Sequence, residues 1–155
     1  NLLAIMFDMN RLWEEYVVRM LKKNKPEGWV VMGQKSKPFW RSKRIRPDIV
    51  LKNKDQTFII DTKWKVIHSE KPSDADLKQM FAYNHYWNAK QSLLLYPNKG
   101  GQVSNQGSFT SRLETDEIHS CKLAFVNVIN DSGLNKNLAS EIFNLLEAQE
   151  QSLEK

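Results

Sequence analysis

Two aspartates and a lysine stand at the ends of two neighbouring apolar runs, where they could bind a metal ion and act on a phosphate. Asp48 directly precedes Ile49-Val50-Leu51, and Asp61 directly follows Phe58-Ile59-Ile60, with Lys63 two residues later. Both runs are rich in β-branched and aromatic residues and are separated by the polar turn KNKDQ, so they predict two short strands. If these strands pair antiparallel, the three charged side chains meet at one edge of the sheet.

Two carboxylates on adjacent strands suit Mg²⁺, or Mn²⁺ in its place, because Mg²⁺ usually takes one or two carboxylates and completes its shell with water and phosphate. We expect Asp48, Asp61 and the backbone carbonyl of Thr62 to be ligands. Alternation along the strand points Asp61 and Lys63 to one side and Thr62 to the other. Lys63 would then orient the attacking water and offset charge in the transition state. The pattern therefore predicts metal-assisted hydrolysis of a phosphodiester.

The competing interpretation is that these charges are solvated residues at strand ends, which the D-x-K spacing taken alone would favour. Their neighbours argue for a buried position. Lys63 lies between the apolar run FII and Trp64, and Asp48 lies between Pro47 and the apolar run IVL. The polar residues therefore interrupt buried strands, as expected of a functional site.

The periodicity of the whole chain predicts an α/β fold with a mixed sheet. Three helices are predicted: from Asp8 or Asn10 to about Lys23, between Ser73 and Asn88, and over Leu138–Leu146. Further strands are predicted over Trp29–Met32, Ser92–Tyr96 and Leu123–Ile129, and a strand over Phe109–Leu113 is considered. Residues 35–47 and residues 98–108 are predicted to be loops, the second because it holds three glycines and little apolar pattern.

Length and composition limit the class of protein. A chain of 155 residues predicts one domain with room for a core. The net charge of +5 makes a polyanion a reasonable partner, although so small an excess carries little weight alone. The single cysteine, Cys121, excludes an internal disulfide and suits the cytoplasm. The opening NLLAIMF lacks the features of a signal peptide or membrane anchor, and its first residue, Asn rather than Met, predicts a piece of a longer protein.

A basic segment leads into the strand that carries Asp48. Between residues 35 and 46 there are six positive charges and no acid, interleaved with two aromatic residues. Most such runs are solvated loops, but this one ends beside the predicted site, so contacts with DNA phosphates are reasonable. The candidate DNA-binding residues are Lys37, Trp40, Arg41, Lys43, Arg44 and Arg46.

Several ordered motifs resemble one nuclease family. RPDIVL followed by FIIDTKWK resembles the PD-(D/E)XK nuclease signature, with Asp in place of the commoner Glu. QMFAY, which holds Gln79 and Tyr83, is similar to the Q-x-x-x-Y element of RecB-like members. With the opening FDMNRLWEEYV, these motifs resemble the nuclease domain of McrC, the cleavage subunit of the McrBC modification-dependent restriction system, from about Phe7 to Tyr96.

The resemblance implies a restriction-endonuclease-like fold, in which helices flank a central mixed sheet, and divalent-metal cleavage of DNA. It makes residues 1–155 a single nuclease domain, the C-terminal part of a longer chain. It implies catalytic roles for Asp48, Asp61, Lys63, Gln79 and Tyr83. It also implies an McrB-like AAA+ GTPase as partner, contacted mainly through an upstream region. The sequence contains no P-loop motif, so another chain would hydrolyse GTP.

In nucleases of this kind the first helix often supplies a glutamate to the metal. At 100° per residue, Glu14 borders the apolar stripe of the first predicted helix, whereas Glu15 faces water. We therefore expect Glu14 to be the additional metal ligand, against the alternative that it is merely solvated at the boundary.

Two other functions fit the same motifs. The chain could be another RecB-like nuclease that acts on DNA ends or single strands, and a circular substrate would separate this alternative because an exonuclease needs an end. It could also be an inactive nuclease-fold module that only binds DNA or protein. The presence of Asp48, Asp61 and Lys63 argues against an inactive module, since loss of activity usually removes one of these groups.

Overall fold

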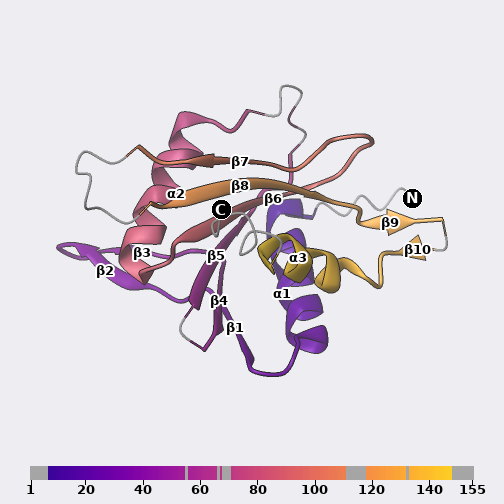
Figure 1. Ribbon diagram of the computed structural model, residues 1–155, viewed down its shortest axis with the longest axis horizontal. Helices are drawn as coiled ribbons and strands as arrows, with labels where there is room; N and C mark the ends of the chain where they lie inside the picture. Colours follow the sequence, from indigo (N-terminus) through magenta and orange to yellow (C-terminus); the bar gives the residue numbers. More distant parts are fainter. Residues whose placement is uncertain are drawn as a thin grey trace, which may run out of the picture.

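A six-stranded mixed sheet forms the centre of the protein (Figure 1). The structure is a computed structural model that describes residues 7–54, 56–65, 67, 71–110, 118–131 and 133–147. In sheet order, the strands are β1 (Trp29–Gly33), β4 (Ile49–Asn53), β5 (Gln56–Thr62), β6 (Gln91–Pro97), β8 (Ser120–Val126) and β7 (Asn105–Ser108). Strands β1, β4 and β5 are antiparallel, β5, β6 and β8 run parallel, and β7 returns antiparallel along β8.

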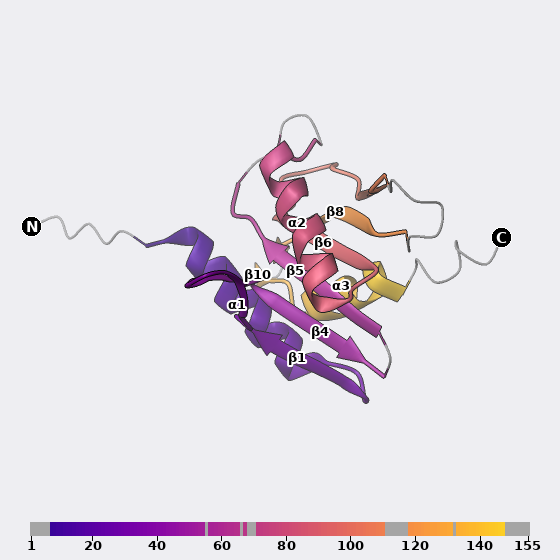
Figure 2. The same cartoon turned by 90° about the vertical axis from the view of Figure 1, so that its left-hand side faces the viewer.

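In the described part of the chain, three helices flank the sheet (Figure 2): α1 (Met9–Asn24), α2 (Asp74–Trp87) and α3 (Leu138–Glu147). Asp8 caps α1 by accepting hydrogen bonds from the backbone N–H groups of Asn10 and Arg11, and Ser73 caps α2 by accepting one from Asp76. Helices α1 and α3 pack on one face of the sheet and α2 on the other. None of the described helices is long and apolar enough to span a membrane. The predicted α/β fold, a central mixed sheet flanked by helices, is confirmed.

The pleat of the central strands divides their side chains between the two helix layers. Val50 of β4 and Ile59 of β5 belong to the apolar cluster under α2, whereas Ile60 belongs to the cluster under α1 and α3. Residues two apart on a strand share a face. Asp48 and Asp61 therefore lie on the same side of the sheet as α2.

The C-terminal half of the chain completes the core. Strand β6 is buried along its whole length between β5 and β8. In the cluster under α1 and α3, the ring of Phe143 from α3 packs on Trp29 of β1, with ring centroids 4.9 Å apart. Helix α3 thus closes the core over the first strand of the sheet.

Both segments that were predicted to be loops contain strands. The basic segment folds into an antiparallel hairpin of β2 (Lys37–Trp40) and β3 (Lys43–Ile45), with Arg41 at the turn in a left-handed conformation, φ 50°. The glycine-containing segment holds the edge strand β7. The loop predictions were wrong because every residue of β2 and β7 is exposed, so neither strand has the apolar alternation that reveals a strand in a sequence.

The strands near the C-terminus are also shifted from their predicted positions. Strand β8 starts at Ser120, three residues before the predicted start, because its first residues lack large apolar side chains. Ile129 belongs instead to a small hairpin of β9 (Ile129–Asn130) and β10 (Gly133–Leu134). No strand forms at Phe109, and residues 111–113 of the strand considered there lie outside the described part of the chain.

Candidate active site

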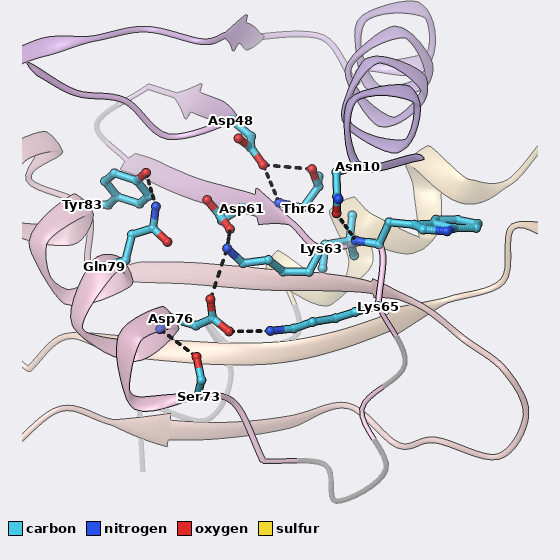
Figure 3. A network of polar contacts seen from close by, with 12 residues as sticks. Asn10, Asp48, Asp61, Thr62, Lys63, Lys65, Ser73, Asp76, Gln79 and Tyr83 are labelled. Atoms are coloured by element: carbon cyan, nitrogen blue, oxygen red, sulfur yellow. Dashed lines mark hydrogen bonds and ion pairs between the residues drawn. The ribbon is translucent and has the colours of Figure 1, made fainter. Parts of the chain in front are cut away.

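Asp48 and Asp61 come together where the β4–β5 pair ends (Figure 3). The two strands pair antiparallel, as predicted, with Ile49 opposite Ile60. Continuing this register by one residue sets Asp48 opposite Asp61 on the α2 side of the sheet. Asp61 is only 3% exposed, whereas Asp48 is half-buried.

Hydrogen bonds and an ion pair hold the two carboxylates. Oδ2 of Asp48 accepts hydrogen bonds from the backbone N–H of Thr62 at 2.7 Å and from its hydroxyl at 2.9 Å. Oδ2 of Asp61 forms an ion pair with Nζ of Lys63 at 2.7 Å (Figure 3), which agrees with the predicted alternation. The contact of the Thr62 hydroxyl with Asp48 was not predicted, because it depends on how Asp48 turns beyond the paired part of β4.

Burial and like charge together make this site unfavourable for two ionised carboxylates. Burial raises the pKa of Asp61 to about 6, the charge of Asp48 adds to the increase, and Lys63 opposes it. Burial would lower the pKa of Lys63, but the carboxylates of Asp61 and Asp76 outweigh burial and hold that pKa above its usual range. A divalent cation between Asp48 and Asp61 would relieve their repulsion.

A third aspartate, Asp76 in the first turn of α2, contacts two lysines. Its Oδ1 lies 3.2 Å from Nζ of Lys63, and its Oδ2 lies 2.9 Å from Nζ of Lys65 (Figure 3). Burial would raise the pKa of Asp76, but Lys65, Ser73 and Lys63 together lower it to about 2. Asp76 is therefore ionised at neutral pH.

Gln79 and Tyr83 link α2 to the chain just before Asp48. The side-chain amide of Gln79 donates to the Tyr83 hydroxyl at 2.6 Å, and this hydroxyl donates to the backbone carbonyl of Arg46 at 2.8 Å. Burial raises the pKa of Tyr83 to about 12, and the charge of Asp61 adds to the effect. Tyr83 thus stays protonated and fixes the position of the segment between β3 and β4 that leads to Asp48.

Glu14 approaches the site from α1. Glu14 is half-buried and Glu15 is exposed, as their helical positions predict. The side chain of Gln34 donates to Oε1 of Glu14 at 2.7 Å, and its backbone N–H donates to the carbonyl of Asp48 at 2.8 Å. Burial raises the pKa of Glu14, the hydrogen bond from Gln34 opposes this, and the charge of Asp48 adds to it. Gln34, which has a φ of 50°, therefore connects Glu14 to Asp48.

These groups surround an open polar cavity of about 990 Å³. The predicted site residues on its lining are Glu14, Arg46, Asp48, Asp61, Thr62, Lys63, Gln79 and Tyr83. Three further cations on one face of α1, Arg11, Arg19 and Lys22, also line it. The cavity thus combines carboxylates suited to a metal with cations suited to phosphate.

The other predicted DNA-binding residues lie on the β2–β3 hairpin, outside the lining of this cavity. Lys37 donates to the backbone carbonyl of Tyr86 in α2 at 2.6 Å. Arg44 donates to the hydroxyl and the backbone carbonyl of Ser36, the residue before β2. At the tip, Trp40 is 59% exposed and the guanidinium of Arg41 lies 4.8 Å from its ring centre. The tip, together with exposed Lys43, is the part of the hairpin open to a ligand.

The donors at the strand ends fit an ion of the magnesium type. Both hydrogen bonds from Thr62 go to Oδ2 of Asp48. No residue in the described part of the chain is seen to bond to Oδ1, so this oxygen could bind a metal ion. Among the described residues, no three His, Cys, Asp or Glu side chains gather to hold a metal. A bound ion would complete its shell with backbone oxygen, water or phosphate, as Mg²⁺ usually does. Coordination by Glu14 stays a prediction.

The sequence did not predict the contacts of Asp76 and Gln34 or the place of the α1 cations at the site. Asp76 stands three residues after Ser73, the spacing of a capping box, which indicates a helix start but not a contact with lysines. No sequence signal marks Gln34. Arg11, Arg19 and Lys22 could have been found, because their spacing sets them on one side of the helix.

Comparisons with known proteins agree with this fold. The model of a family described as "McrBC 5-methylcytosine restriction system component" matches residues 1–97. Among solved structures, the chain is similar to a chain of the "refined half-complex from tetradecameric assembly of Thermococcus gammatolerans McrB AAA+ hexamers with bound McrC", with a TM-score of 0.65 and 18% identity. The match covers 92% of this chain and 34% of that one, so the present chain spans about a third of its length. At this identity the likeness shows the fold alone. No curated protein matches the chain.

Proposed function

The chain belongs to the family of McrBC 5-methylcytosine restriction system components, and on this basis we propose that it is a metal-dependent DNA endonuclease domain. One observation carries the proposal. Asp48, Asp61 and Lys63 meet where two strands end, in an open cavity lined by cations. A buried carboxylate beside a second carboxylate is energetically costly, and a metal ion bound between them would offset that cost.

The site residues have distinct parts in the proposed reaction. Asp48 and Asp61, with the carbonyl of Thr62 and with Glu14, would hold Mg²⁺, or Mn²⁺ in its place. A bound metal would supply Lewis-acid chemistry to the phosphate and to a water molecule. Lys63 would orient the attacking water and offset negative charge on the phosphate. Gln79 and Tyr83 fix the backbone before Asp48.

We place the DNA backbone along the cations of the cavity and the tip of the β2–β3 hairpin. Arg46 lines the cavity at the base of the hairpin, and Arg41 and Lys43 lie at its tip. Lys37 and Arg44, which are bonded within the protein, support the hairpin's shape in this proposal. The exposed ring of Trp40 adds an apolar contact to the phosphate contacts.

The domain would work as the cleavage part of an McrBC-like modification-dependent restriction system. The similar solved structure contains McrC bound to McrB AAA+ hexamers. We propose a similar AAA+ partner for the protein that carries this domain, bound mainly through a region outside the present chain. Recognition of modified DNA and hydrolysis of GTP would then belong to that partner.

A plasmid-nicking assay tests the proposal. The purified chain should nick supercoiled plasmid with Mg²⁺ or Mn²⁺, and the nicking should stop when EDTA is added. Asp61→Asn should reduce nicking by several orders of magnitude. Asp74→Asn, which changes an exposed aspartate of the same protein outside the cavity lining, should not. Nicking that survives EDTA or the Asp61 substitution would overturn the metal site, and activity confined to linear DNA would favour a nuclease that acts on ends.

A further inference from the structure

Lys63 is held by two carboxylates from different parts of the fold. Its Nζ lies 2.7 Å from Oδ2 of Asp61 on the same strand end and 3.2 Å from Oδ1 of Asp76 on α2 (Figure 3). The side chains of both aspartates are largely buried, 5% and 11% exposed, and that of Lys63 is 22% exposed. These contacts are therefore shielded from the screening that weakens surface ion pairs.

Asp61 would bind the metal and also forms the ion pair with Lys63, and these two interactions compete for the same carboxylate. The carboxylate that would bind the metal is the one that contacts the lysine, through Oδ2 at 2.7 Å. A metal that binds Asp61 draws its charge away from Lys63. The ammonium then needs another anion to stay beside the reacting phosphate.

We propose that Asp76 is a positioning residue that keeps Lys63 in the site when Asp61 binds the metal. This inference rests on the proposed nuclease function. The carboxylate of Asp76 then serves as the ion-pair partner of Lys63, so the lysine does not compete with the metal for Asp61.

The setting of Asp76 favours this role. Its backbone N–H donates to the side chain of Ser73 at 3.1 Å, which is half of a capping box. In a capping box the acid at this position reaches back to the N-terminal end of its own helix. Here the carboxylate instead contacts Lys63 through Oδ1 and Lys65 through Oδ2. Each carboxylate oxygen of Asp76 contacts a lysine, and the helix N-terminus favours its negative charge. These interactions hold the side chain in place beside Lys63.

A double-mutant cycle separates positioning from a general effect of charge. Without Asp76, Lys63 can pair only with Asp61 among the aspartates that it contacts in the structure, and it competes with the metal. Asp76→Asn should therefore weaken Mn²⁺ binding about tenfold, about 1.4 kcal/mol, when Lys63 is present. In a Lys63→Met background, the same substitution should change Mn²⁺ affinity little. A purely electrostatic influence would weaken binding equally in both backgrounds.

The experiment measures Mn²⁺ affinity of the whole chain by calorimetry and by the metal-dependent rise in melting temperature, so it does not depend on cleavage. It compares the wild type, Asp76→Asn, Lys63→Met and the double variant. Asp74→Asn, from the same helical turn and exposed, is the matched control and should bind Mn²⁺ like the wild type. Circular dichroism checks folding, and Asp76→Gln, whose uncharged amide suits this position of a capping box, replaces Asp76→Asn if the latter does not fold.

The outcomes distinguish this inference from the proposed function. If Asp76→Asn weakens Mn²⁺ binding when Lys63 is present but not when Lys63 is replaced by Met, the positioning role is supported. An equal loss in both backgrounds, or no loss in either, overturns it while the nuclease proposal stands. A wild type that does not bind Mn²⁺ overturns both.

Discussion

Replacing Asp61 with Asn sets the function of the site against the stability of the fold. The substitution keeps the shape of the side chain and removes one buried charge. Burial and Asp48 raise the pKa of Asp61 from its ordinary value of 3.8 to about 6. Below about pH 4 the group is neutral in both the folded and the unfolded chain. Between about pH 4 and pH 6 the unfolded chain ionises more readily, so the wild-type fold loses stability as pH rises.

The size of the effect follows from these values. The two pKa values differ by about 2, and each pKa unit corresponds to about 1.4 kcal/mol, so ionised Asp61 costs the metal-free fold about 3 kcal/mol above pH 7. For a chain of this length, each kcal/mol shifts the melting temperature by roughly 2–4 °C. Asp61→Asn should therefore melt like the wild type near pH 4 and up to about 10 °C higher near pH 7.5, both without metal.

The assay is thermal melting from pH 4 to pH 8 in chelator and again with Mn²⁺, with plasmid nicking in parallel. At one hundred times its dissociation constant, a bound metal stabilises the fold by about 2.7 kcal/mol. The wild type should gain this stability with Mn²⁺. Asp61→Asn should gain much less and should not nick, because it has lost an anionic ligand.

The opposite pattern would refute the reasoning. If Asp61 is only a structural residue at a strand end, Asp61→Asn should be less stable than the wild type at pH 7.5 and keep its response to Mn²⁺. The exposed Asp74→Asn variant is the control, and its melting temperature should follow that of the wild type at every pH. A destabilised Asp61→Asn that still nicks plasmid would end the hypothesis of a metal site.

Three further predictions concern DNA binding, a buried hydrogen bond and the metal. Replacing both Arg41 and Lys43 with alanine should weaken binding to all DNA sequences alike, measured by fluorescence anisotropy. The slope of log affinity against log salt concentration should fall by about one unit per lost phosphate contact. An altered sequence preference with an unchanged slope would contradict this. Tyr83→Phe should lower the free energy of unfolding by about 1–3 kcal/mol in denaturant melts, because the carbonyl of Arg46 loses its donor. Ca²⁺ should support DNA binding in gel shifts without efficient nicking, because it holds water and phosphate in a looser geometry than Mg²⁺; efficient nicking with Ca²⁺ would count against the proposed site.

The parts of the fold that bury apolar side chains could be read from the sequence. The runs IVL and FII are separated by a short polar turn, and this arrangement was enough to predict an antiparallel pair and the meeting of Asp48 with Asp61. Helices α1 and α2 could be predicted in the same way, because Asp8 and Ser73 are capping residues that precede segments with helical apolar periodicity. These signals are local, and local signals are what a single sequence records.

The missed features depend on solvent-exposed backbone or on how distant elements dock. Strands β2 and β7 carry no buried residue, so only backbone pairing reveals them. The contacts of Asp76 with Lys63 and Lys65 require α2 to begin beside the end of β5, which no spacing in the sequence encodes. Gln34 was missed because its role arises from a left-handed backbone turn and two hydrogen bonds.

The burial of β6 between β5 and β8 limits where the chain can be shortened. All predicted site residues precede residue 98, so a fragment of residues 1–97 would keep every one of them. It would nevertheless lose β8 and Phe143, uncover the parallel edge of β6 and expose the ring of Trp29. Such an uncovered edge pairs readily with other molecules. The fragment should therefore aggregate during expression, and during synthesis on the ribosome the site residues emerge well before the strand that makes their sheet soluble.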